Sequence, residues 1–158
     1  MIVTPNNISA KLNAISCDFR AIFAKACTCS GVKAAFPSRR LVAVFEPRTN
    51  TSRRSIFQAA YASAFGSADM VVVRDPRDVE TIAVDDRFDS QRLAEDLKAV
   101  GKAARAFEST DAILQFLLED LRRGDVVLIM SNGSFDNLGR NILTSVREAD
   151  DEGSDSLR

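Results

Sequence analysis

One stretch of the sequence decides the fold: residues 41–73, which read LVAVFEPRTNTSRRSIFQAAYASAFGSADMVVV. The first five residues are all apolar, as in a strand that is buried on both faces of a sheet. A polar loop follows at 46–54. The apolar residues of 55–65 then recur at helical spacing until Gly66, a residue type that favours a helix end. The apolar run at 70–73 predicts another buried strand, so this stretch predicts a βαβ unit.

The same alternation continues towards the C-terminus. After a polar loop, the spacing predicts helix 90–100, strand 103–107, helix 111–121, strand 126–130 and helix 135–147. The caps expected for the first two of these helices are Asp89 or Ser90, and Ser109 or Thr110. Strands alternating with helices of this length predict an α/β fold, a Rossmann-like three-layer sandwich with a mainly parallel sheet.

The two ends of the chain fit this pattern less well. Residues 21–36 predict a helix that ends before Pro37. No strand is predicted in the first part of the chain, although the sheet could recruit one there. Residues 148–158 are rich in acidic residues and are expected to form a disordered acidic tail.

Composition excludes several classes of protein. The chain has 158 residues, and 21 Lys and Arg against 22 Asp and Glu leave a net charge of −1. This balance argues against a nucleic-acid partner, because nucleic-acid-binding domains are usually strongly basic. No apolar run approaches the ~20 residues of a membrane span, and the first residues lack the features of a signal peptide. We therefore expect a cytoplasmic protein with no membrane partner.

Histidine is absent and cysteine is scarce, which limits the chemistry. Without histidine, the Ser-His-Asp and Cys-His types of catalysis are excluded within this chain. The three cysteines, Cys17, Cys27 and Cys29, fall short of the four ligands of a structural zinc site, so we expect reduced thiols on a helix. An acidic cluster at 85–89 could in principle hold magnesium, but a solvated loop is the preferred interpretation. No metal site and no catalytic residue are predicted.

Charged side chains near that acidic cluster are expected to be exposed. Arg74, Arg77 and Arg87 lie beside Asp85, Asp86 and Asp89 in the sequence. The mixture of signs is typical of a solvated surface, and we assign these arginines no role in a site.

Two polar loops are the candidate site, because each follows a buried strand directly. Residues 46–54 (EPRTNTSRR) contain three arginines, whose planar guanidinium groups suit carboxylate or phosphate. Residues 131–135 (SNGSF) contain small side chains that let backbone N–H groups approach a ligand. Since the carboxyl ends of parallel strands share one edge of a sheet, we expect Arg48 and Ser131 to lie close together in one anion pocket.

An alternative interpretation makes both loops ordinary turns. In that case Asn132 or Gly133 would adopt a positive φ, and Ser134 would cap the last helix. Neither loop is a GxGxxG dinucleotide motif, and the sequence contains no GxxxxGK[ST] phosphate-binding loop. The chain is therefore not expected to bind ATP in the P-loop manner.

The same two loops carry a resemblance to a known family. LVAVFEPRTNT (41–51) and GDVVLIMSNGSF (124–135) resemble the C-terminal domain of Mur ligases. The branch with the greatest similarity is that of the recycling UDP-N-acetylmuramate:L-alanyl-γ-D-glutamyl-meso-diaminopimelate ligases. The resemblance covers about residues 17–147 and leaves 1–16 as an unassigned N-terminal segment. It implies that an incoming peptide is held by Arg48, Asn50, Thr51, Ser131, Asn132, Gly133 and Phe135, with Phe135 against an apolar stem.

The resemblance also implies where the cofactors are bound. ATP and magnesium belong to the parent family and are held mainly by its central domain, which this chain does not resemble, so no cofactor is assigned to the chain. The family domain opens near an Asp-Asp-Phe-Ala-His-His-Pro motif beside the nucleotide. Here residues 17–23 read CDFRAIF, in which Asp18 and Phe19 match and are implied to be nucleotide-proximal. Ala21, Ile22 and Phe23 replace the two histidines and the proline, and Gly139 stands where the family usually has a histidine.

The function expected from this resemblance is that of the peptide-binding C-terminal domain of an ATP-dependent amide ligase in peptidoglycan recycling. That ligase joins a murein peptide to UDP-N-acetylmuramate. The chain lacks the ATP and UDP-sugar domains, so it is predicted to be inactive alone, and those domains could be partners as a separate chain. Two alternatives stay open. One is a non-catalytic module or accessory subunit that binds an anionic peptide or another small anion, and the other is a non-functional gene remnant.

Overall fold

The computed structural model describes residues 2–3 and 22–155. Its strands are β1 Ile2–Val3, β2 Leu41–Phe45, β3 Met70–Arg74, β4 Ala103–Phe107 and β5 Val126–Met130. Its α-helices are α1 Ile22–Ala35, α2 Gln58–Ala64, α3 Ser90–Ala99, α4 Thr110–Asp120 and α5 Leu138–Asp155. Three 3-10 turns complete the chain: η1 Ser55–Phe57, η2 Val84–Asp86 and η3 Phe135–Asn137. The predicted alternation of strands and helices after residue 40 is confirmed.

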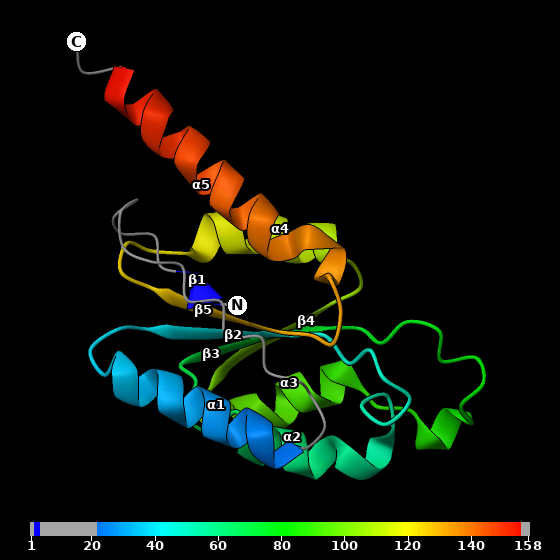
Figure 1. Ribbon diagram of the computed structural model, residues 1–158. Coiled ribbons are helices and arrows are strands. Elements are labelled where there is room, and N and C mark those ends of the chain that lie inside the picture. Colours follow the sequence, from blue (N-terminus) through cyan, green and yellow to red (C-terminus); the bar gives the residue numbers. More distant parts are fainter. Residues whose placement is uncertain (1, 4–21, 156–158) are drawn as a thin grey trace.

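The five strands form one sheet in the order β1-β5-β2-β3-β4. The four long strands run parallel, and only β1 is antiparallel, paired with β5. Helices α1, α2 and α3 cover one face of the sheet, and α4 and α5 cover the other (Figure 1). The predicted α/β three-layer sandwich with a mainly parallel sheet is therefore confirmed.

Strand β2 shows why its sequence is continuously apolar. Alternate residues of a strand point to opposite faces of the sheet, and both faces are covered here. Phe45 lies in the core cluster beneath α2 and α3, where its ring centroid is 5.0 Å from that of Tyr61 and 5.6 Å from that of Phe65. Val44 lies in the opposite cluster, with Leu117 of α4. The strand is thus fixed from both sides, which holds the loop that follows it.

The helix starts follow the expected capping chemistry. The side chain of Asp89 accepts a hydrogen bond from the backbone N–H of Arg92 at 2.9 Å, at the start of α3. Ser109 does the same for Ala112 at 3.1 Å, at the start of α4. The structure therefore selects Asp89 and Ser109 from the two pairs of candidates.

Two expectations for the ends of the chain need correction. The short strand β1 pairs Ile2 with Leu128 and Val3 with Val127, because β5 would otherwise present an open edge. Helix α5 continues to Asp155, so the expected disordered tail is wrong for residues 148–155. Residues 148–152 (EADDE) contain no proline or β-branched residue that would interrupt a helix. Residues 156–158 lie outside the described residues.

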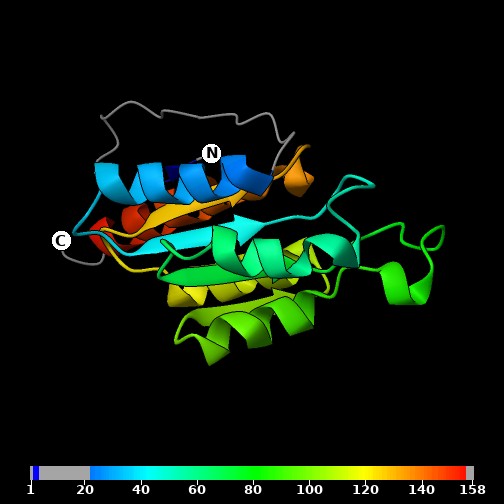
Figure 2. The same cartoon turned by 90° about the horizontal axis from the view of Figure 1, so that it is seen from below.

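The register of the sheet sets the position of the candidate loops. Phe45 pairs with Met130 of β5 on one side and with Val73 of β3 on the other. Strands β2 and β5 therefore end at the same level, and β3 ends one residue further on. The loops that leave them emerge together at one edge of the sheet (Figure 2), which we call the carboxyl edge.

Candidate functional site

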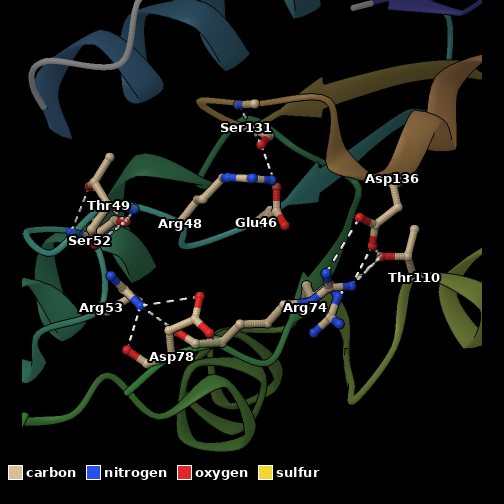
Figure 3. Close-up of polar contacts among 12 residues, drawn as sticks. Glu46, Arg48, Thr49, Ser52, Arg53, Arg74, Asp78, Thr110, Ser131 and Asp136 are labelled. Atoms are coloured by element: carbon tan, nitrogen blue, oxygen red, sulfur yellow. Dashed lines mark hydrogen bonds and ion pairs between the residues drawn. The ribbon is translucent and has the colours of Figure 1, made fainter. Parts of the chain in front are cut away.

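Glu46 joins the two loops that the sequence singled out. Its carboxylate accepts a hydrogen bond from the hydroxyl of Ser131, and the same oxygen, Oε2, lies 3.9 Å from Nη1 of Arg48. The Ser131 hydroxyl also accepts a hydrogen bond of 3.1 Å from the backbone N–H of Gly133. Figure 3 shows Arg48 and Ser131 converging on Glu46. The prediction that Arg48 and Ser131 lie close together is confirmed.

Gly133 explains how Arg48 can lie against the second loop. A Cβ added to Gly133 would lie 2.9 Å from Nε, Cζ and Nη1 of Arg48. That is well below the ~3.5–4.0 Å of an ordinary carbon contact, so the guanidinium occupies space that only glycine leaves free. Any larger residue at 133 would displace the flexible end of Arg48 from this position.

The alternative of two ordinary turns is contradicted in its details. The positive φ values after β5 lie at Phe135, Asp136 and Asn137, not at Asn132 or Gly133. Ser134 stands at the cap position of η3 but makes no capping hydrogen bond with its side chain. The left-handed residues turn the chain sharply, which directs the side chain of Phe135 into the core.

Phe135 does not have the role that the resemblance implied. Its side chain is 1% exposed and belongs to the core cluster that also contains Leu138 and Ile142. The expected packing of Phe135 against an apolar stem of the ligand is therefore wrong. Phe135 instead anchors the loop that carries Ser131 and Gly133.

The remaining residues of the first loop form a rigid turn. The backbone N–H of Thr49 donates to the hydroxyl of Ser52 at 2.8 Å, and the N–H of Ser52 donates to the hydroxyl of Thr49 at 3.1 Å. Asn50 is exposed, and its amide oxygen accepts a hydrogen bond of 2.6 Å from Arg53. Thr51 is exposed as well. Arg53 and Asn50 therefore stabilise the turn that presents Arg48.

The three arginines of this loop differ in their partners. Arg53 also donates to the backbone carbonyls of Arg77 and Asp78, at 2.5 and 2.6 Å, which ties the loop to residues 75–89. The backbone of Arg54 forms an isolated antiparallel β-bridge with the backbone of Arg87. Arg48 keeps a side chain that is 49% exposed beside the buried Glu46. Arg48 is thus the arginine of this loop that is both held in place and open to a ligand.

A third group of residues completes the carboxyl edge, and the sequence did not reveal it. Nε of Arg74 donates to the hydroxyl of Thr110 at 3.1 Å, and that hydroxyl donates to Asp136 at 2.7 Å. Arg77 forms an ion pair with the same carboxylate. This network joins the end of β3 to the start of α4 and to η3, across the site from Glu46 (Figure 3).

The expectation that Arg74 is an exposed surface charge is wrong. Arg74 is 5% exposed because it is the last residue of a buried strand. Burial lowers its pKa, and the neighbouring Arg77 adds to this, while Glu46, Asp136 and Asp75 oppose it. The available signal for a role at this edge was that Arg74 directly follows the apolar run 70–73, as Glu46 and Ser131 follow the apolar runs of their strands.

The carboxylate of Asp136 is held in its charged form. The hydrogen bond from Thr110 lowers its pKa, against a smaller opposing effect of burial, and Arg77 and Arg74 lower it further. Three guanidinium groups, those of Arg48, Arg74 and Arg77, therefore lie at the carboxyl edge with three carboxylates, those of Glu46, Asp75 and Asp136. Arg77 is paired with Asp136, whereas Arg48 lies 3.9 Å from the carboxylate of Glu46 and is half exposed, so Arg48 is the cation that favours an anionic ligand.

Other candidate groups serve the fold. Asp89 caps α3, and within residues 2–3 and 22–155 no three His, Cys, Asp or Glu side chains come together in a way that could hold a metal ion. Cys29 is buried, and burial raises its pKa to about 11, so the thiol is neutral at pH 7. Asp18 and Phe19 lie outside the described residues.

Comparison with known proteins identifies relatives of this architecture. The family model described as "Mur ligase, glutamate ligase domain" matches residues 24–133. A UDP-N-acetylmuramate–L-alanine ligase of Variovorax paradoxus is 34% identical over 113 residues, which cover 69% of this chain and 22% of that protein. This chain thus spans less than a quarter of that relative.

Two solved structures share the fold. The murein peptide ligase of Psychrobacter arcticus superposes with a TM-score of 0.64 at 26% identity, covering 78% of this chain and 25% of that one. A domain described as part of a UDP-N-acetylmuramate:L-alanyl-γ-D-glutamyl-diaminopimelate ligase of Haemophilus ducreyi gives a TM-score of 0.60 at 22% identity, covering 80% and 84%. In the part of this chain that the structure describes, no helix is long and apolar enough to cross a membrane.

Proposed function

This chain belongs to the Mur ligase family, whose glutamate ligase domain matches residues 24–133, and we propose that it holds the incoming murein peptide of an ATP-dependent amide ligase. The ligase would join that peptide to UDP-N-acetylmuramate in peptidoglycan recycling. The observation that carries the proposal is the position of Arg48. Its half-exposed guanidinium is held between Glu46 and the backbone of Gly133, at the edge where parallel sheets bind ligands.

The chemistry of a murein peptide fits this site. A γ-D-glutamyl-diaminopimelate peptide carries several free carboxylates, and an arginine binds a carboxylate through two parallel hydrogen bonds. Arg48 already approaches one carboxylate, Glu46, at a distance of 3.9 Å, which is too long for a hydrogen bond. Its donors are therefore available to a ligand.

The other steps of the reaction belong elsewhere in the ligase. Amide formation through an acyl-phosphate needs a nucleotide whose phosphates and magnesium are held in place. The sequence contains no phosphate-binding loop. We assign ATP and the UDP-sugar to other domains, in the same protein or in a separate chain, and the reaction to the cytoplasm. Purified alone, this chain should release no phosphate from ATP.

A second candidate for the incoming amine is L-alanine. The observation that favours it is the 34% identity with a UDP-N-acetylmuramate–L-alanine ligase, which exceeds the identity with the Psychrobacter murein peptide ligase. The two candidates differ in charge, because free alanine has one carboxylate and the murein peptide has several. The half-exposed guanidinium groups of Arg48 and Arg77 suit the peptide better, because an arginine binds a carboxylate directly.

Calorimetric titration distinguishes the candidates. We expect L-alanyl-γ-D-glutamyl-meso-diaminopimelate to bind more tightly than L-alanine. Arg48→Ala should lower the affinity for the peptide by roughly tenfold to a hundredfold, as expected for the loss of one charge-assisted contact of about 1.5–3 kcal/mol.

Arg122→Ala is the matched control. It removes the same charge from an exposed turn just before β5, at the opposite edge of the sheet. Equal effects of the two substitutions would mean non-specific attraction between charges. Tighter binding of L-alanine would replace the recycling role with a biosynthetic one.

A further inference from the structure

The carboxylate of Glu46 is buried with few hydrogen-bond donors. The side chain is 5% exposed, and one of its oxygens, Oε2, receives the hydroxyl of Ser131. Among the described residues, no hydrogen bond is made to the other oxygen, Oε1. A carboxylate can accept about four hydrogen bonds, and Oε1 is not among the buried side-chain atoms that lack a partner, so a donor can reach it from outside. The carboxylate of Glu46 therefore has capacity for a further donor.

The surroundings of Glu46 fix its orientation and leave that oxygen available. Ser131 and Arg48 both approach Oε2, and Figure 3 shows the second oxygen pointing away from both. The Ser131 hydroxyl is held in turn by the N–H of Gly133 at 3.1 Å. The charge of Arg74, at the end of the neighbouring strand β3, also interacts with Glu46. An additional donor would meet a preorganised carboxylate.

We propose that Glu46 binds an ammonium group of the incoming peptide while Arg48 binds one of its carboxylates. The pair would then recognise a zwitterionic ligand rather than any anion, and Glu46 would be a specificity-determining residue. An ammonium group supplies three donors, and its charge-assisted hydrogen bonds to a carboxylate are among the strong ones. This inference rests on the proposed function, because it names the part of the murein peptide that the site selects.

The murein peptide offers two ammonium groups of the same chemistry. One is the N-terminus of its alanine, which is the nucleophile of the proposed reaction. The other is on the side chain of diaminopimelate. Two analogues separate them: a peptide with an N-acetylated alanine, and a peptide in which 2-aminopimelate replaces diaminopimelate. Each analogue lacks one ammonium group and keeps every carboxylate.

Calorimetry on the full chain with these three peptides tests the proposal. We expect one analogue to bind roughly tenfold to a hundredfold more weakly than the parent peptide, the range of one lost charge-assisted contact. In Glu46→Gln, the difference between that analogue and the parent should shrink to less than about threefold. The matched control is Glu119→Gln, an exposed residue towards the C-terminal end of α4, which should keep the full difference.

Ser131→Ala separates ammonium binding from a purely structural role of Glu46. This variant removes the donor that orients the carboxylate but keeps the carboxylate itself. Ammonium binding predicts that the analogue still binds more weakly than the parent peptide in Ser131→Ala. A loss of that discrimination equal to the loss in Glu46→Gln would overturn the proposal.

The failure of this inference can be told apart from the failure of the proposed function. If all three peptides bind with equal affinity and Arg48→Ala still lowers that affinity, the site binds anions and the role of Glu46 is overturned. If no peptide binds and Arg48→Ala has no effect, both proposals are overturned.

Discussion

The two arginines that flank strand β2 do opposite things. Arg40 precedes the strand and is surrounded by acceptors: it pairs with Asp120 and Asp125 and donates to the backbone carbonyl of Asp120 at 3.2 Å. Arg48 follows the strand and has one carboxylate, Glu46, at 3.9 Å. The side chain of Arg40 is 22% exposed and that of Arg48 is 49% exposed. The first arginine stabilises the fold, and the second is open to a ligand.

The same contrast extends to the two edges of the sheet. At the edge where the parallel strands begin, Lys33 pairs with Asp69. The carboxylate of Asp69 also accepts a hydrogen bond of 2.7 Å from the backbone N–H of Leu41. Those charges balance one another within the fold. At the carboxyl edge, Arg77 pairs with Asp136, but the guanidinium of Arg48 lies 3.9 Å from the carboxylate of Glu46, too far for a hydrogen bond. A cation that is not hydrogen-bonded to a carboxylate, beside small, exposed residues, is what distinguishes a candidate site from a structural ion-pair network.

Removing Arg40 should give the largest effect on stability. Arg40→Ala leaves the carboxylate of Asp125, which is 4% exposed, without its cation. Because an unpaired buried charge is costly, we expect the free energy of unfolding to fall by about 2–4 kcal/mol. Arg48→Ala should change it by less than about 1 kcal/mol, because Arg48 is half exposed and Glu46 keeps the hydrogen bond from Ser131 and the charge of Arg74. Urea denaturation of both variants measures this, and equal losses would break the comparison.

Crowding Arg48 should impair binding and leave stability nearly unchanged. In Gly133→Ala the new methyl group would lie 2.9 Å from three atoms of the Arg48 guanidinium, so that flexible end must move. We expect affinity for the murein peptide to fall about tenfold, the equivalent of ~1.4 kcal/mol. Calorimetry checks this, with Gly31→Ala as the control, because a Cβ there has nothing within 4 Å. Unchanged affinity would show that Arg48 does not need its present position.

Relieving the left-handed turn after β5 should have a smaller, stabilising effect. Asn137 adopts φ +58°, a conformation that costs an L-residue more than glycine. We expect Asn137→Gly to raise the free energy of unfolding by about 0.5 kcal/mol, measured by urea denaturation. Asn132→Gly is the matched control: Asn132 is not among the residues with positive φ, so the same change should be neutral or slightly destabilising.

The smallest expected effect concerns pH. The pKa of Asp136 is lowered in the folded state, chiefly by the hydrogen bond from Thr110 and then by Arg77. Its contribution to stability is therefore complete above the ordinary carboxyl pKa near 4 and is lost as the pH falls through the lower, folded value. Because its side chain is 40% exposed, solvent screens the contribution. As the pH is lowered from 5 to 2, the melting temperature of Asp136→Asn should fall less than that of the unsubstituted protein. Identical pH profiles of the two proteins would contradict this role.

Local patterns determined most of the fold. The apolar runs at 41–45, 70–73 and 126–130 predicted buried strands, and the spacing of apolar residues between them predicted the helices, because both depend on neighbours within a few positions. The placement of both polar loops at one edge followed from parallel strands. The short strand β1 did not follow, because pairing with a distant strand edge leaves little local signal. The length of α5 did not follow either, because an acidic segment with Gly and Ser is also typical of a disordered tail.

The sequence by itself determined an α/β sheet with polar loops at its carboxyl edge, and a resemblance in two motifs that pointed to the Mur ligase family. Only the tertiary structure decided which of those polar residues are exposed and which are buried or paired. Glu46 and Ser131 are 85 positions apart in the sequence, as are Arg40 and Asp125, and these pairings make one arginine open and the other saturated. The burial of Phe135 and Arg74 was decided in the same way. Partners supplied by distant strands and helices set the charge balance and exposure of each side chain, and no local pattern encodes them.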